Sequence, residues 1–213
     1  MDSIDYIKLI NYIKCLEEHY YNRVNDWNFN YNLNLKRIQV RQFLGNKELQ
    51  LFTLDYILKF NSIIKKQVNF NINGVSFDYR IKIENSVYSK IDRYNDSELK
   101  GKVPIIKCLN DLLGIRFIIE DTDCYNCVLN KVEENFKDKK HYKFIDSSKN
   151  GYKGYHLYIK IDNYMFPFEI QFWKKEDEKT NKNYHNIYKQ SYTNIEKCMS
   201  KDEIKKEGVE DEV

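Results

Sequence analysis

Residues that interrupt helices and strands, and residues that could cross-link the chain, are scarce in this sequence. Its 213 residues include two prolines and seven glycines, so few positions force a turn or end a helix. The five cysteines are an odd number, which excludes a fully paired disulfide framework, and we expect a reduced, cytoplasmic protein. Cys124 and Cys127 form a C-x-x-C pair, but a structural zinc site needs a second pair that the sequence lacks. We therefore interpret both residues as thiols at the start of a helix.

Long apolar runs and an excess of one charge are missing as well. No apolar run approaches the roughly 20 residues of a membrane-spanning helix, and the amino-terminal segment mixes charges into its apolar positions, unlike a signal peptide. The 35 basic and 32 acidic residues leave a formal charge of +3, too little to indicate general nucleic-acid binding. What is present is 42% hydrophobic residues, enough for the core of one domain with an appended helical segment.

Hydrophobic periodicity predicts an amino-terminal helical segment over residues 1–70, followed by a mixture of helices and strands. Within this segment we predict helices over 3–24 and over 33–66, the second with a break at Gly45. We expect residues 71–195 to form the main domain and residues 196–213 to form a carboxy-terminal tail. The further predicted elements are an extended segment at 71–82, a helix at 85–94, a short helix at 104–113, a buried strand at 114–120, a helix at 123–137, a weak strand at 141–145 and a helix at 178–190.

Two runs of alternating apolar and polar residues predict a β-hairpin at 155–173. A tight turn at Asp162–Asn163 would place Leu157 opposite Phe168 and His156 opposite Glu169, with all apolar side chains on one face. The other face carries Glu169 and Gln171. A single glutamate on a strand is more often solvated surface than a functional group, so its interpretation depends on its neighbours.

The loop KNGYKGYH precedes this hairpin and combines glycine, lysine and an aromatic ring. Gly151 and Gly154 allow the backbone to approach a ligand closely or to adopt a positive φ. Tyr152 can stack on a nucleobase, which is worth ~1–3 kcal/mol, and Lys153 can meet a phosphate. The alternative is an ordinary glycine-rich turn with solvated lysines.

A second cluster lies in YRIKIENSVYSK. Arg80 and Lys82 share one face of an extended segment, and Ser86 and Lys90 share one face of a helix. A strand-to-helix bend at 83–85 would aim all four at one place, where three cations and a hydroxyl suit a triphosphate. The alternative is a solvated basic face.

A third feature is the stretch NDLLGIRFII, in which Asp111 precedes a buried strand and Arg116 lies inside it. A buried guanidinium needs a partner or a ligand. Asp111 and Glu169 are candidates for the two carboxylates of a magnesium site. The alternative for Asp111 and Arg116 is an internal ion pair with each other.

These motifs occur in the order R-x-K-x3-S-x3-K, D-x2-G-x-R, N-G-Y-x3-H and E-x-Q. The ordered set resembles the synthetase domain of the RelA/SpoT family, which makes guanosine tetra- and pentaphosphate, over roughly residues 75–189. The resemblance implies an α/β (α+β) fold like that of nucleotidyltransferases, with a mixed, partly antiparallel sheet flanked by helices. It also implies transfer of the β,γ-pyrophosphate of ATP to the 3′-hydroxyl of GDP or GTP, with Mg²⁺.

The resemblance further implies a role for each matching residue. Tyr152 would stack on the guanine of the acceptor, and Glu169 would bind metal and activate the acceptor hydroxyl. The implied sets are Arg80, Lys82, Ser86, Lys90 and Arg116 for ATP; Asp111 and Glu169 for metal and catalysis; and Asn150, Tyr152, Lys153, His156 and Gln171 for the acceptor.

The sequence also departs from the family pattern. None of its four histidines is followed by aspartate, so we expect a small synthetase without the family's hydrolase domain. Trp173 stands where the family usually has arginine, and His185 and Tyr188 form an H-x-x-Y pattern that is similar to toxin-type relatives. These relatives leave the acceptor open, because some of them modify tRNA and others make another alarmone. A toxin-type protein would also have an antitoxin partner. The resemblance to small relatives implies a homo-oligomer. Two further alternatives are a nucleotide- or RNA-binding module without catalysis and a structural α/β domain.

Overall fold

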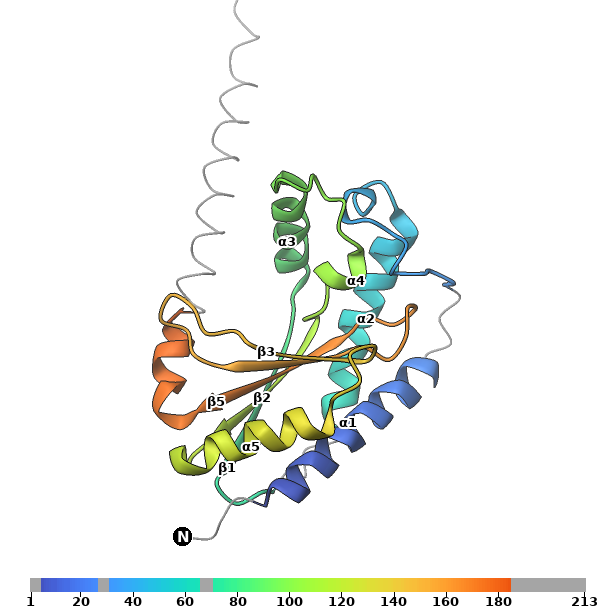
Figure 1. Ribbon diagram of the computed structural model, residues 1–213. Helices are drawn as coiled ribbons and strands as arrows, with labels where there is room; N and C mark the ends of the chain where they lie inside the picture. Colours follow the sequence, from blue (N-terminus) through green and yellow to red (C-terminus); the bar gives the residue numbers. More distant parts are fainter. Residues whose placement is uncertain (1–4, 27–30, 66–70, 185–213) are drawn as a thin grey trace, which may run out of the picture.

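The chain folds around a five-stranded mixed sheet in the computed structural model, which describes residues 5–26, 31–65 and 71–184 (Figure 1). The strand order is β1-β2-β5-β4-β3. β2 and β5 are parallel, and the other neighbouring pairs are antiparallel. This is the predicted α/β fold with a mixed, partly antiparallel sheet. The strands are β1 Val75–Ile81, β2 Leu113–Ile119, β3 Tyr142–Asp146, β4 Tyr155–Ile159 and β5 Phe168–Lys174.

Helices lie on both sides of this sheet. Figure 1 shows α1 and α5 below it, while α3 and α4 rise above it. One core joins the helices to the sheet. No helix in the described part of the chain is long and apolar enough to cross a membrane. The elements are α1 Tyr6–Asp26, α2 Lys47–Lys65, α3 Glu84–Asp96, α4 Ile105–Cys108, α5 Thr122–Asn135, and the short 3₁₀ helices η1 Val40–Gln42 and η2 Lys175–Asp177.

The carboxylate of Asp121 caps the amino terminus of α5 by accepting from the backbone N–H groups of Asp123 and Cys124. Cys124 and Cys127 therefore lie at the start of a helix, as predicted. Among the described residues, no group of three or more His, Cys, Asp or Glu side chains could hold a metal ion.

The predicted helix at 33–66 is correct only after its break at Gly45. Residues before the break form turns and η1, and α2 begins at Lys47. Long-range backbone hydrogen bonds replace the helical ones here: Val40 N–H donates to the Val103 carbonyl, and Ile105 N–H to the Ile38 carbonyl. Tertiary pairing thus overrides local helix propensity.

Two other predicted helices also differ from the structure. The helix expected at 104–113 is the single turn α4. The one expected at 178–190 is helical over 178–184, and its remainder lies outside the described residues, as does the predicted tail at 196–213.

The two alternating runs are neighbouring strands, but they pair two residues away from the predicted register. Leu157 lies opposite Ile170, not Phe168. The connection is residues 160–167 rather than a two-residue turn at Asp162–Asn163. Because a shift of two preserves the alternation of a strand, each side chain still lies on the predicted face.

The helical layer accounts for the longer connection. Phe166 is 1% exposed and packs edge-on against Tyr56 with ring centroids 5.2 Å apart. The Tyr20 hydroxyl donates to the Phe166 carbonyl, and Leu35 N–H donates to the Asn163 carbonyl. These contacts draw the residues before β5 into the core and away from the strand pair.

The polar face of β4 and β5 is buried. Glu169 and Gln171 are 4% and 3% exposed, because β5 is a central strand covered on both faces. His156 lies opposite Gln171, and Tyr158 opposite Glu169, so the predicted pairing of His156 with Glu169 across the strands is wrong. Buried polar side chains must find hydrogen-bond partners, and those partners form the site described next.

Candidate active site

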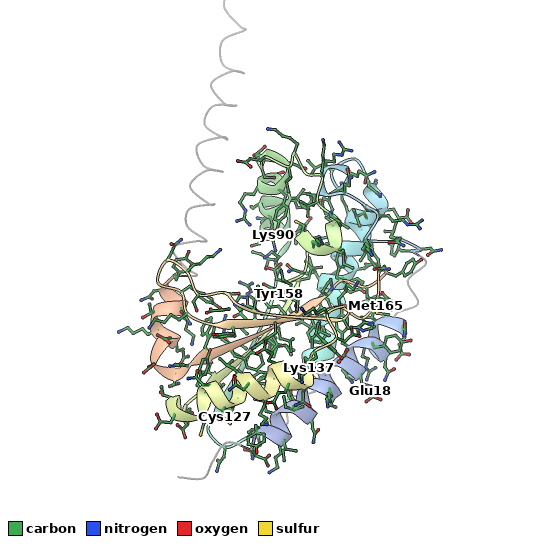
Figure 2. The ribbon with its side chains drawn as sticks, viewed as in Figure 1. Glu18, Lys90, Cys127, Lys137, Tyr158 and Met165 are labelled. Atoms are coloured by element: carbon green, nitrogen blue, oxygen red, sulfur yellow. The ribbon has the colours of Figure 1, made fainter. Side chains whose placement is uncertain are left out.

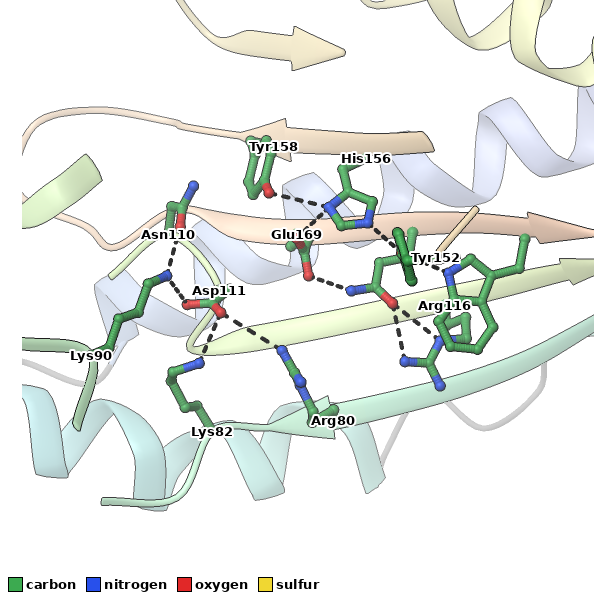
Figure 3. Close-up of polar contacts among 12 residues, drawn as sticks. Arg80, Lys82, Lys90, Asn110, Asp111, Arg116, Tyr152, His156, Tyr158 and Glu169 are labelled. Atoms are coloured by element: carbon green, nitrogen blue, oxygen red, sulfur yellow. Dashed lines mark hydrogen bonds and ion pairs between the residues drawn. The ribbon is translucent and has the colours of Figure 1, made fainter. Parts of the chain in front are cut away.

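Three cations meet at the carboxylate of Asp111 (Figure 3). The ammonium groups of Lys82 and Lys90 lie 2.8 and 2.9 Å from its two oxygens, and Nη2 of Arg80 lies 3.7 Å from Oδ2. Arg80 comes from β1, Lys82 follows it, and Lys90 comes from α3, which begins three residues after β1 ends. The predicted strand-to-helix bend is therefore confirmed.

This cluster keeps an excess of positive charge. Three cations against one carboxylate leave two positive charges in a place where the side chains of Lys82, Lys90 and Asp111 are 11–14% exposed. Burial opposes ionisation of Asp111, but the two ammonium groups hold its pKa far below the usual range. Burial also lowers the pKa of Lys82, against the attraction of Asp111. Such a cluster favours a ligand with several negative charges.

A second polar network surrounds Glu169. Its Oε1 lies 2.8 Å from Nδ1 of His156, and its Oε2 accepts a hydrogen bond of 2.7 Å from Nε2 of Gln171. Burial would raise the pKa of Glu169, but the hydrogen bond and charge of His156 outweigh burial, and the pKa lies below its ordinary value. The structure thus holds this buried carboxylate ionised and in a defined orientation.

Arg116 fixes the orientation of Gln171. Its Nε and Nη2 donate to Oε1 of Gln171 at 3.1 and 3.0 Å. Because a guanidinium can only donate, the amide NH₂ of Gln171 must face Glu169. Nη1 of Arg116 also lies 3.2 Å from Asp78, directly opposite on β1, and its Cζ lies 3.5 Å from the centre of the Trp173 ring. The partner that Arg116 was predicted to need is therefore Asp78, while Asp111 pairs with other cations.

Tyr152 extends the network of Glu169 towards the glycine-containing loop. Nε1 of Trp173 donates to the Tyr152 hydroxyl at 2.8 Å, and that hydroxyl lies 2.5 Å from Nε2 of His156. The Tyr152 residue is 5% exposed, and burial raises the pKa of its hydroxyl well above the ordinary value. In this conformation the Tyr152 hydroxyl is neutral and forms hydrogen bonds. The ring would have to turn outward to stack on a base.

The family assignment rests on a match to a protein-family model. The model describes the region found in RelA/SpoT proteins and matches residues 79–211, more than half of the chain. The chain belongs to the RelA/SpoT family. A search of the curated proteins finds no match.

Solved structures similar to this RelA/SpoT chain include small alarmone synthetase 1 from Bacillus subtilis, at 18% identity and a TM-score of 0.39, covering 67% of this chain and 76% of that one. A structure of small alarmone synthetase 1 bound to its product pppGpp is 16% identical with a TM-score of 0.39, covering 74% and 93%. Small alarmone synthetase 2 from the same organism is 19% identical with a TM-score of 0.37, covering 71% and 83%.

Three of the predicted residues, Ser86, Asn150 and Lys153, make no hydrogen bond or ion pair with Asp111 or Glu169. Ser86 lies in the first turn of α3, half-buried. Asn150 is exposed at the loop turn with a φ of 50°. Lys153, predicted for the acceptor, has an ammonium group 3.0 Å from Asp177 and a side chain that is 66% exposed. The structure therefore gathers most, but not all, of the predicted residues around Asp111 and Glu169.

Sequence reasoning gave no site role to several residues that the structure places here. Tyr158 has its hydroxyl 3.2 Å from Nδ1 of His156, and its position on the polar face of β4 was the available signal. Asp78 could have been found only from the pairing of β1 with β2. Figure 2 shows Lys90 and Tyr158 on the upper side of the sheet and Cys127 and Lys137 on the lower side, so the C-x-x-C pair lies away from the site.

Gly154→Ala is expected to destabilise the folded protein by about 1–3 kcal/mol, as overpacking of a tight contact does. A Cβ at Gly154 would meet Cδ1 of Trp173 at 2.8 Å and the Tyr152 hydroxyl at 3.1 Å. Gly45→Ala is the matched control, because a Cβ there meets nothing within 4 Å. Urea unfolding of the two variants makes the comparison. Equal stability of both would show that the contact with Trp173 relaxes freely.

Proposed function

We propose that this RelA/SpoT protein is a pyrophosphokinase that converts ATP and GDP or GTP into AMP and guanosine tetra- or pentaphosphate. The 3′-oxygen of the acceptor forms a bond to the β-phosphorus, and the bond between this phosphorus and the oxygen bridging it to the α-phosphorus breaks. The observation that carries the proposal is the pair of adjacent networks, one with excess positive charge at Asp111 and one with the ionised carboxylate of Glu169.

The cations around Asp111 are proposed to bind the triphosphate of ATP. Phosphoryl transfer depends on positioning and on neutralising charge more than on covalent help. Arg80, Lys82 and Lys90 supply that charge from three positions around one carboxylate. We also propose that Ser86 and Arg116 contact ATP, by the family resemblance.

Glu169 is proposed to take the proton from the 3′-hydroxyl of the acceptor. A general base must be ionised and within hydrogen-bond reach of the hydroxyl. Glu169 accepts hydrogen bonds from His156 and Gln171, and the Tyr158 hydroxyl is a third hydrogen-bonding neighbour; a carboxylate has about four lone-pair sites, which leaves one for the acceptor hydroxyl. These donors orient the carboxylate while leaving it able to accept a proton.

Asp111 and Glu169 are carboxylates, the ligand type that magnesium takes from proteins. Magnesium is usually held by one or two carboxylates together with phosphate oxygens and water, and these two carboxylates interact electrostatically across the site. We propose that both residues hold Mg²⁺. When bound, the ion would neutralise charge on the transferred phosphates.

The acceptor is proposed to bind beside the 149–154 loop, with Asn150, Tyr152, Lys153, His156 and Gln171 as its ligands. We propose that the Tyr152 ring turns outward to stack on the guanine, and we expect Tyr152→Ala to raise KM for the guanine nucleotide about 5–150-fold, because base stacking on an aromatic ring is worth ~1–3 kcal/mol. The KM for ATP should change little.

Tyr152→Phe is the control for this prediction, because it keeps the ring and removes the hydroxyl that meets His156 and Trp173. Steady-state kinetics with each substrate varied in turn make the measurement. An equal rise of both KM values in Tyr152→Ala would refute stacking on the acceptor.

The deciding assay offers γ-labelled ATP and Mg²⁺ with GDP, GTP, GMP and total tRNA separately. Label moving to GDP or GTP supports the proposal. Label moving only to tRNA would keep the chemistry and change the acceptor, and no transfer would contradict an active synthetase. A homo-oligomer, an antitoxin partner and a cytoplasmic location stay predictions.

A further inference from the structure

The side chain of Asn181, which lies outside the 149–154 loop, forms hydrogen bonds with the backbone of this loop. Its Oδ1 accepts from the backbone N–H of Lys153 at 2.9 Å, and its Nδ2 donates to the backbone carbonyl of Lys153 at 2.7 Å. Asn181 is 0% exposed and lies in the helical turn 178–184 after β5. A carboxamide presents an acceptor and a donor side by side, as a peptide group does, so it satisfies both polar groups of one residue at once.

The other backbone-to-backbone hydrogen bonds of this loop run within the loop and its flanks, while the side chains of Tyr152 and Lys153 reach Trp173 and Asp177. Lys149 and Tyr152 pair through their backbones, and Ser147 N–H donates to the Gly154 carbonyl. These bonds fix the shape of the turn. Gly154 leads directly into β4, and β4 pairs with β5, so the carboxy-terminal end of the loop is anchored to the sheet. The hydrogen bonds to Asn181 tie the Lys153 backbone to the segment after β5, beside the ion pair of the Lys153 side chain with Asp177.

The position of the Lys153 backbone affects the site through the neighbouring residue, Tyr152. Tyr152 precedes Lys153 directly, and its hydroxyl meets Nε2 of His156, whose Nδ1 lies 2.8 Å from Glu169. A displaced Lys153 backbone would displace Tyr152 as well. The bond to Asn181 is therefore connected to the Glu169 carboxylate through two intervening side chains.

We propose that Asn181 is a positioning residue for the acceptor nucleotide, an inference that rests on the proposed function of the 149–154 loop. It acts through the backbone of Lys153 and does not contact the reacting atoms. Holding a binding loop in place before the ligand arrives lowers the entropy cost of binding. The three cations around Asp111, which come from β1, the residue after it and α3, form their ion pairs with Asp111 and not with this loop.

Asn181→Ala is expected to raise KM for the guanine acceptor on the order of tenfold, because two hydrogen bonds to the loop are lost. KM for ATP should change less than about twofold, which is about 0.4 kcal/mol, because Asn181 contacts the Lys153 backbone and none of the cations around Asp111. Asn183→Ala is the matched control, because Asn183 is exposed in the same helical turn. Amide hydrogen exchange at Lys153, followed by NMR, supplies a readout that needs no activity, and exchange should speed up in Asn181→Ala alone.

A second substitution at Asn181 keeps the proposal testable if Asn181→Ala does not fold. Asn181→Ser is neutral and smaller, and its hydroxyl can keep at most one of the two hydrogen bonds to Lys153, so its acceptor KM should lie between those of wild type and Asn181→Ala. Equal rises of the two KM values, or an unchanged acceptor KM, in whichever variants fold would overturn the positioning role. A wild-type protein without transfer to any guanine nucleotide would instead overturn the proposed function, and the acceptor role with it.

Discussion

Glu169→Gln is expected to lower the rate of pyrophosphate transfer about 10²–10⁴-fold, the usual contribution of a general base, while ATP binding stays close to that of the wild type. The amide has the shape of the carboxylate but cannot take the proton of the 3′-hydroxyl. The cations that would hold ATP surround Asp111 and not Glu169. Single-turnover transfer and ATP titration by calorimetry measure the two effects separately.

The control for this change is Glu176→Gln, the same substitution at an exposed position near the end of β5. It should leave transfer unchanged. Thermal unfolding of both variants checks that the fold survives. If Glu169→Gln abolished ATP binding as well, the assignment of Glu169 to the acceptor side would be wrong.

Asp111→Asn is expected to combine loss of transfer with a loss of stability of about 3–5 kcal/mol, as when one partner of a buried ion pair is removed. The substitution leaves Lys82 and Lys90, whose side chains are 11% and 14% exposed, without their carboxylate. The cluster would then carry three uncompensated positive charges. Chemical unfolding gives the stability, and the labelled-ATP assay gives the rate.

A nucleotide triphosphate should partly restore the stability of this variant. ATP without magnesium would bring negative charge to the same three cations, so it should raise the melting temperature of Asp111→Asn more than that of the wild type. Asp138→Asn serves as the control, because that carboxylate is 57% exposed and pairs with His141 and not with the cations around Asp111. A smaller rise in Asp111→Asn than in the wild type would contradict triphosphate binding at this cluster.

The sequence by itself determined the local geometry of the cations around Asp111. The spacing of Arg80 and Lys82 places both on one face of an extended chain, and Lys90 follows on the first turns of a helix. The structure confirms the bend between them and the convergence of all three cations. These features depend only on the repeat of a strand and of a helix, which a short stretch of sequence contains.

Only the tertiary structure decided which groups meet across the sheet. Asp78 faces Arg116 because β1 pairs with β2, and Glu169 is buried because β5 lies in the middle of the sheet. Asn181 reaches Lys153 across 28 residues of sequence. Such contacts depend on strand order, on register and on how the segments between strands pack against the helices. No local pattern contains that information, because one segment pairs equally well with several others until the whole core is packed.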